Sequence, residues 1–292
     1  MKEPPEDRSQ QGHLGWPLEG LHPTDDNPPM ALPRSTSLLF LALLTGCGAR
    51  VVVDGTADAA GDAGPKAMSY LGNSADALYA IKIPEPDSGE LARVDLLTTL
   101  QGCDGILDIA MNRAGELYAT SPTALYTVDV ADGACNIVAK GSYPESITFA
   151  PAGAVTPGAE ALVGYSGSTY LRIDPFTGAV TPLGGLGAGI TSTGDLAAFP
   201  SGEVFVIALG EGCDSCLYRV DPQTGAFAEA FDPPEPNVAG LAYDEGGLYA
   251  VLSPIGVRWF STTSTTGVVG KVYSFYGPNE EVELRGATTV NW

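Results

Sequence analysis

Asp108 and Asp195 are the two residues of this sequence whose type and position best suit chemistry. Each lies at the entry of a short apolar segment, LDIAMN from Leu107 and DLAAFP from Asp195. Two carboxyl groups about 5 to 9.5 Å apart can cleave a glycosidic bond. Carboxylate oxygens also suit a hard cation such as Ca²⁺. The pair therefore allows a carboxylate-driven, glycosidase-like hydrolase or a Ca²⁺ site, which a lactonase-like enzyme would use. Solvated loop acids in an acidic chain are the alternative that needs no site.

The overall charge excludes one class of partner. The chain has 292 residues, with 35 acidic against 14 basic side chains and a formal charge of −21. Such a charge opposes the capture of phosphate groups, so we expect no nucleic acid partner. The 37 glycines and 23 prolines indicate a chain rich in turns, and the hydrophobic fraction of 44% is sufficient for a core. This composition predicts a globular, all-β protein.

The segment from Met30 to Cys47 has the features of an export signal. Arg34 precedes an apolar run at 38–44, which is too short to cross a bilayer, and the string LTGC follows it. LTGC resembles the bacterial lipobox, which implies cleavage before Cys47 and a diacylglycerol on its sulfur. Because Gly48 follows, the pattern resembles lipoproteins sorted to the outer membrane. We therefore predict an exported protein that is lipid-anchored to the bacterial outer membrane or cell surface.

This signal divides the chain into four parts. Residues 1–29 are proline-rich and acidic, as disordered segments are, and precede Met30, so we expect them to be disordered or to result from a start codon assigned too early. We assign 30–46 to the signal peptide, 47–69 to the lipidated cysteine and a flexible linker, and 70–292 to the folded domain.

Cleavage before Cys47 would also remove every histidine. His13 and His22 are the only two in the sequence. Catalytic arrangements of Ser, His and Asp, Cys–His pairs and His-ligated metals all need an imidazole. The mature chain therefore cannot use these chemistries.

Short apolar segments recur along residues 70–292. One set is DALYAI, GELYAT, EALVGY, GEVFVI and GGLYAV, in which we take Leu78, Leu117, Leu162, Val204 and Leu248 as equivalent. A second set follows it as ELARVD, ALYTVD, TYLRID, CLYRVD and KVYSFY. A third precedes it as LDIAMN, SITFAP, DLAAFP and GLAYDE. A repeat of about 45 residues with four strands is typical of a β-propeller blade.

The repeats predict the number of blades and how the ring closes. Five blades fit the length, whereas seven would leave too few residues for four strands each. The first blade lacks its innermost segment, and GATTVNW from Gly286 to Trp292 supplies one. We therefore expect a five-bladed propeller that is closed by its C-terminal strand, which leaves no open sheet edge. The innermost segments would then bring Asp108, Ser146, Asp195 and Gly240 to the channel mouth, with Asp104, Glu145 and Asn237 just upstream.

The strings VDVADG, IDPFTG and VDPQTG recur after the second set. Asp can accept backbone N–H groups at a turn, Pro presets φ, and Gly takes the positive φ that ends the turn. We interpret them as hairpin turns and not as a ring of catalytic acids. These repeats resemble bacterial quinoprotein-like and YVTN-type propellers. Quinone binding is not implied, because the tryptophan of each quinoprotein repeat is absent.

Four cysteines remain after Cys47. Cys213 and Cys216 form a CxxC, which can be a disulfide, a redox pair or half of a zinc site. No second CxxC and no mature His accompany it, which favours a disulfide that closes the turn. Cys103 and Cys135 then pair across the second blade, as is usual in an exported protein.

Leu252 to Gly270 is longer than its counterparts in the other blades, which is typical of a binding loop. Arg258, Trp259 and Phe260 are adjacent in it and would suit a sugar ring or a protein partner. Trp259 packing between blades is the alternative.

Three function classes follow from these patterns. The favoured one is a non-catalytic envelope lipoprotein whose propeller binds a glycan, a small molecule or another envelope protein. The second is the carboxylate- or Ca²⁺-dependent hydrolase, with Asp108 and Asp195 as its catalytic or metal-binding residues. The third is a purely structural envelope component.

Overall fold

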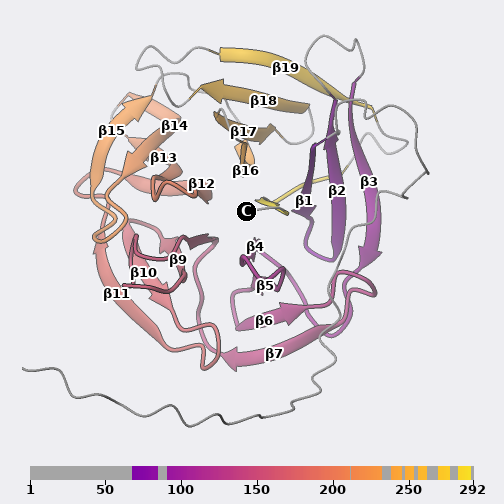
Figure 1. Ribbon diagram of the computed structural model, residues 1–292, viewed down its shortest axis with the longest axis horizontal. Helices are drawn as coiled ribbons and strands as arrows, with labels where there is room; N and C mark the ends of the chain where they lie inside the picture. Colours follow the sequence, from indigo (N-terminus) through magenta and orange to yellow (C-terminus); the bar gives the residue numbers. More distant parts are fainter. Residues whose placement is uncertain are drawn as a thin grey trace, which may run out of the picture. The chain divides into compact units, whose positions relative to one another are not determined.

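The computed structural model describes residues 68–84, 91–210, 212–231, 238–244, 247–252, 256–261, 269–276 and 282–290. All of them belong to the unit Ala49–Trp292. Their strands form antiparallel blades of four strands each, and Figure 1 shows these blades around a common centre. The predicted upstream segment, signal peptide and lipidated Cys47 lie outside the described residues, as does most of the linker, and these assignments stay predictions.

Each blade runs from an innermost strand at the centre to a fourth strand at the rim. Blade 1 contains β20 (Gly286–Thr289), β1 (Met68–Asn73), β2 (Ala77–Ile83) and β3 (Ala92–Thr99). Blade 2 contains β4 (Asp108–Met111), β5 (Leu117–Thr120), β6 (Ala124–Val128) and β7 (Cys135–Lys140). Blade 3 contains β8 (Ser146–Ala150), β9 (Ala161–Ser166), β10 (Thr169–Ile173) and β11 (Val180–Gly185). Blade 4 contains β12 (Thr191–Ala198), β13 (Val204–Gly210), β14 (Cys213–Val220) and β15 (Phe227–Phe231). Blade 5 contains β16 (Val238–Asp244), β17 (Gly247–Leu252), β18 (Gly256–Ser261) and β19 (Val269–Tyr276).

The predicted fold is confirmed: the protein is a five-bladed β-propeller. The C-terminal strand β20 pairs with β1, from Tyr70 opposite Thr289 to Asn73 opposite Gly286. It therefore completes blade 1, as the repeat pattern predicted. A further join was not predicted. The rim strands β19 and β3 pair in parallel, which links blades 5 and 1 into one eight-stranded sheet.

The predicted repeat register is wrong in blade 1. Leu117, Leu162, Val204 and Leu248 all lie on the second strand of their blades, whereas Leu78 lies on β2, the third strand. The segment SADALY of blade 1 therefore matches SPTALY of blade 2. In both segments the serine hydroxyl, of Ser74 or Ser121, accepts the N–H of the residue two positions later. The second strand of blade 1 is β1, which the sequence comparison did not detect.

Blade 5 contains a second error of register. The segment KVYSFY, predicted to match the third strands, forms the rim strand β19. The third strand is β18, which lies inside the segment predicted as an insertion, Leu252 to Gly270. Its residues Arg258 and Trp259 pair with Ala250 and Tyr249 of β17 in regular antiparallel register. Blade 5 therefore has its third strand where a protruding loop was expected.

The core lies between the blades. Among the described residues, five clusters of buried side chains each join a different pair of neighbouring blades. On β4, Ile109 and Met111 pack toward blade 1, while Ala110 packs toward blade 3. Because successive side chains of a strand point to opposite faces, both faces of these inner strands need apolar residues. This explains why Ile109, Ala110 and Met111, the residues of β4 that follow Asp108, are all apolar and do not alternate with polar residues.

The repeated Asp-containing strings form the hairpin turns that were predicted, and they also join blades. In the turn Asp174–Gly178, Asp174 Oδ1 accepts the N–H groups of Phe176 and Thr177, and Gly178 has a φ of 69°. The carbonyl of Gly178 accepts the phenolic hydroxyl of Tyr143, which follows blade 2. This turn therefore positions a glycine carbonyl against the preceding blade.

Tyr165 makes the same kind of contact with the next turn and gives a direct test. Its hydroxyl, on blade 3, donates to the carbonyl of Gly225 in the turn of blade 4 at 2.7 Å. Replacing Tyr165 with phenylalanine leaves that buried carbonyl unsatisfied, so we expect the free energy of unfolding in urea to fall by about 1 to 2 kcal/mol. Tyr143→Phe removes the equivalent bond to Gly178 at 3.0 Å and should have a similar effect. An unchanged unfolding midpoint in both variants would contradict this role.

Candidate functional site

The innermost strands place five equivalent positions around the centre of the ring. These positions are Asp108 on β4, Ser146 on β8, Asp195 on β12, Gly240 on β16 and Gly286 on β20. The backbone N–H that follows each of them points to one of the two carboxyl groups. Two acids and three small residues therefore share one level of the central channel.

Each carboxyl group accepts hydrogen bonds from more than one blade. Asp108 accepts the N–H of Ile109, at 2.8 Å on Oδ1, and of Ile147 on β8, at 2.6 Å on Oδ2. Two side-chain oxygens thus tie blades 2 and 3 together.

Asp195 ties three blades. Its Oδ1 accepts the N–H of Leu196 at 2.6 Å. Its Oδ2 accepts two more N–H groups, from Leu241 on β16 at 2.7 Å and from Ala287 on β20 at 3.0 Å. Together the two carboxyl groups satisfy N–H donors of all five innermost strands, including the strand that closes the ring.

The two carboxyl groups are buried and lie against adjacent residues of β20, Asp108 against Gly286 and Asp195 against Ala287. Asp108 is 1% exposed and Asp195 is 2% exposed. Burial raises the pKa of Asp108 well above its usual value, and the charge and hydrogen-bonding contact of Asp195 raise it further, against the lowering effect of the two N–H donors. Burial also raises the pKa of Asp195, although hydrogen bonds from Asp108 and from three backbone N–H groups oppose the shift. The pair therefore resists carrying two negative charges.

Neutral groups surround Asp108. A Cβ built on Gly286 would collide with a carboxylate oxygen of Asp108 and would lie 2.8 Å from Asn73 Oδ1, so only glycine fits there. Asn73 is completely buried, and among the described residues no donor reaches its Oδ1. Thr120, which pairs with Asp108 across β4 and β5, is also buried, with its hydroxyl unbonded to any described group.

The structure partly agrees with the site predicted from sequence. It brings Asp108 and Asp195 together, with Ser146 at the same level, but deep inside the ring and not at an open mouth. Asp104 and Glu145 are exposed, and Asn237 lies outside the described residues. Within the described ranges no three His, Cys, Asp or Glu residues gather closely enough to hold a metal ion. Each of the four carboxylate oxygens accepts at least one N–H, and a metal-binding role for the pair stays a prediction.

Arg258, Trp259 and Phe260 lie on the regular strand β18. Arg258 and Trp259 are half-buried, and Trp259 packs against the cluster between blades 5 and 1. This is the packing alternative considered for Trp259. A ligand-binding role for the three residues stays a prediction, and the packing of Trp259 between blades does not support it.

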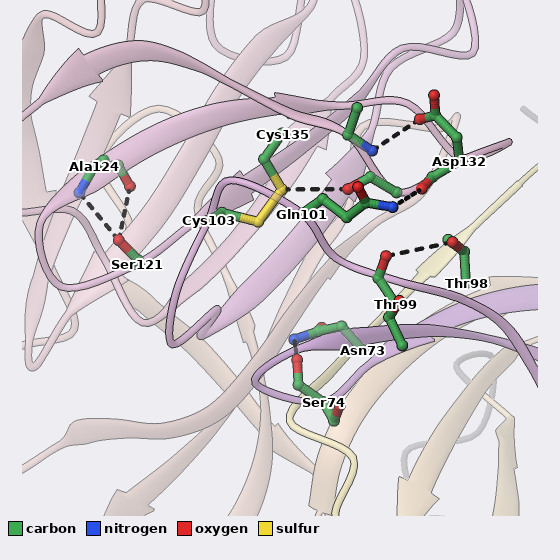
Figure 2. Close-up of a disulfide and its surroundings, with 12 residues drawn as sticks. Asn73, Ser74, Thr98, Thr99, Gln101, Cys103, Ser121, Ala124, Asp132 and Cys135 are labelled. Carbon is green, nitrogen blue, oxygen red and sulfur yellow. Dashed lines mark hydrogen bonds between the residues drawn. A yellow bond between two sulfur atoms is a disulfide. The ribbon is translucent and has the colours of Figure 1, made fainter.

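Both predicted disulfides are present. Cys103 and Cys135 join the loop before β4 to the rim strand β7, with their Cα atoms 5.6 Å apart. Figure 2 shows this disulfide beside Gln101, whose side-chain amide donates to the carbonyl of Asp132 at 3.3 Å. Cys213 and Cys216 close the start of β14, with Cα atoms 5.9 Å apart. Disulfides indicate an extracytoplasmic protein.

Comparisons with known proteins agree on the fold. No family model matches the chain, and no curated protein matches it. One similar solved structure is a symmetrical protein from work on de novo evolutionary emergence, with 14% identity, 77% of this chain and 100% of that chain covered, and a TM-score of 0.50. Another is the nidogen/laminin complex, with 14% identity, 77% and 86% covered, and a TM-score of 0.47. A protein of unknown function from Bacteroides caccae has 11% identity, 78% and 100% covered, and a TM-score of 0.42. At these identities the likeness is one of fold.

The described part of the chain consists of strands, turns and loops. Within it, no helix has the length and apolar character needed to cross a membrane.

Proposed function

We propose that this chain is a non-catalytic, exported lipoprotein whose propeller acts as a ligand- or protein-binding scaffold in the cell envelope. The observation that carries the proposal is that Asp108 and Asp195 accept hydrogen bonds from the backbone of the ring. Both carboxyl groups are buried, and their oxygens hold backbone N–H groups of the five innermost strands. The acids that a hydrolase would use are therefore engaged in closing the ring.

The same geometry argues against the hydrolase alternative. A glycosidase needs a gap of about 5 to 9.5 Å between its carboxyl groups, so that a sugar and a water molecule can enter. Here the two groups contact each other and are out of reach of solvent. A Ca²⁺-dependent hydrolase would in addition need lone pairs that the N–H donors partly occupy.

Export and anchoring belong to the proposal. The two disulfides support an oxidising compartment. The LTGC string supports lipidation of Cys47 and anchoring at the outer membrane or cell surface. Expression of the whole chain in a bacterium tests this part: the protein should fractionate with membranes and carry a lipid-sized mass at its N-terminus. Cys47→Ser should abolish both, and an unlipidated wild-type protein would contradict the anchoring.

Native mass spectrometry of the purified protein with pooled envelope glycans and Ca²⁺ tests the binding function. An added mass with the glycan intact supports a binding scaffold. Shortened glycans would contradict the proposal, provided that Asp108→Asn abolishes the shortening. If the protein stays bare, cross-linking in intact cells decides, because a scaffold for proteins should give a defined cross-linked partner. The absence of both ligand and partner would leave only a structural role and would overturn the proposal.

A further inference from the structure

Where the carboxyl groups of Asp108 and Asp195 meet, hydrogen-bond acceptors outnumber donors. The five backbone N–H groups approach Asp108 and Asp195 from the surrounding strands. The two carboxyl groups lie against adjacent residues of β20, because the Cβ position of Gly286 meets a carboxylate oxygen of Asp108 and the N–H of Ala287 donates to Asp195. If both groups were ionised, neither could donate a hydrogen bond to the other. Asn73 Oδ1 is a further acceptor close to the pair, because it and a carboxylate oxygen of Asp108 both lie beside Gly286.

Among the described residues, no positive side chain compensates the pair. Asn73 of β1, Thr120 of β5 and Gly286 of β20 lie beside Asp108, and Ser146 of β8 and Gly240 of β16 occupy the equivalent positions of their strands; all five are neutral. Within this part of the chain, the charged neighbour that acts on each carboxyl group is the other one. Two adjacent buried negative charges without a cation are costly, and one proton held between two carboxyl groups removes that cost.

We propose that Asp108 and Asp195 hold one shared proton at neutral pH, and that this proton makes closure of the ring dependent on pH. The proton satisfies the contact between the two carboxyl groups, while the carboxylate that stays ionised accepts the N–H groups of Leu241 and Ala287 or of Ile147. Since Ala287 belongs to β20, loss of the proton would weaken the attachment of the strand that closes the ring.

The direction of the pH effect follows from the extra proton in the folded state. Folding raises the pKa of the coupled pair, so the folded protein keeps one shared proton above the ordinary aspartate pKa of about 4, where the unfolded chain has lost it. Stability from this site is complete below that pKa and is lost as the pH rises through the folded pKa. One proton corresponds to about a tenfold change in the unfolding equilibrium constant per pH unit.

Urea unfolding from pH 5 to 9 tests the proposal with wild-type protein and the Asp108→Asn variant. The unfolding constant of the wild type should rise about tenfold per pH unit relative to the variant, until the pair loses its proton in the folded state. In the Asp108→Asn variant, the new amide donates an N–H to Asp195 in place of the shared proton. We expect Asp195, which then accepts four N–H groups, to stay ionised from pH 5 to 9, so the contribution of this site to the variant should be flat. The two proteins share every other titratable group, so the contributions of those groups cancel. Parallel pH profiles would overturn the proposal.

A second measurement uses the wild-type protein alone and so does not depend on how well the Asp108→Asn variant folds. In that variant the N–H groups of Ile109 and Ile147 have one acceptor oxygen instead of two, and one of them faces the new NH₂ group, which destabilises the fold. Infrared spectra of wild-type protein at pH 7 should contain the C=O band of a protonated carboxylic acid, which shifts when aspartate is labelled with ¹³C. Absence of that band would overturn the shared proton. Stabilisation by added Ca²⁺ that EDTA reverses, again without the band, would show that a cation holds the pair and would overturn the proposal too.

Discussion

Replacing Asp195 with alanine is expected to lower the free energy of unfolding by about 3 kcal/mol or more. The substitution leaves three buried N–H groups, of Leu196, Leu241 and Ala287, without their acceptor. Each buried donor that loses its partner costs about 1 to 3 kcal/mol. Relief of the repulsion with Asp108 offsets part of this loss. Urea unfolding, followed by both tryptophan fluorescence and far-UV circular dichroism, would measure the change.

Asp174→Ala is the matched control for this prediction. Asp174 also accepts backbone N–H groups through its side chain, those of Thr177 and Phe176, and these bonds hold its pKa below the usual value. It lies in an exposed turn, where water can replace the lost acceptor, so we expect a smaller loss than for Asp195→Ala. Equal losses in the two variants would show that the central position of Asp195 adds nothing to stability.

Removal of the Cys103–Cys135 disulfide is expected to have the other large effect. It closes a loop with a sequence separation of 32, whereas Cys213–Cys216 closes one of 3. The chain-entropy estimate gives about 4 kcal/mol for the long loop and about 2 kcal/mol for the short one. We therefore expect the double alanine variant at 103 and 135 to lose about twice as much stability as the one at 213 and 216.

Alanine is the suitable replacement, because Cys103 is buried in the cluster between blades 1 and 2 and a serine would add a polar group there. The backbone around this disulfide carries its own support, since the backbone of Gln101 hydrogen-bonds to Gly133 and Cys135. If the variant at 103 and 135 unfolds at the same urea concentration as the wild type, these contacts suffice and the disulfide is not a main stabilising element.

The blades could be predicted from the sequence because each repeat carries local signals. Asp, Gly and apolar residues recur at similar intervals, and the turns at Asp174 and Asp221 form as the pattern indicates. Closure by the C-terminal strand followed from the missing inner segment of blade 1. The register failed where local similarity was ambiguous, as at Leu78, because LYA occurs both in second strands and in the third strand of blade 1.

Only part of the site could be predicted from the sequence. The repeats brought Asp108 and Asp195 to the same level of the channel, but their contact depends on which way side chains point across non-adjacent blades. The available signal was the pattern of Asp, Ser, Asp and two glycines at the five equivalent positions, since small residues leave room for two buried acids. Trp259 was misplaced for a different reason: a strand that varies in sequence looks like an insertion until its pairing with Tyr249 is known.

Amide hydrogen exchange, resolved residue by residue, tests the central claim that two carboxyl groups hold the five innermost strands together. In the wild-type protein, the amides of Ile109, Ile147, Leu196, Leu241 and Ala287 should exchange as slowly as the best-protected core amides. In Asp195→Ala, the last three should lose protection beyond the loss common to all core amides, while Ile109 and Ile147 should follow only that common loss. Rapid exchange of the five amides in the wild type, or unchanged relative protection of Leu241 and Ala287 in the variant, would contradict the account.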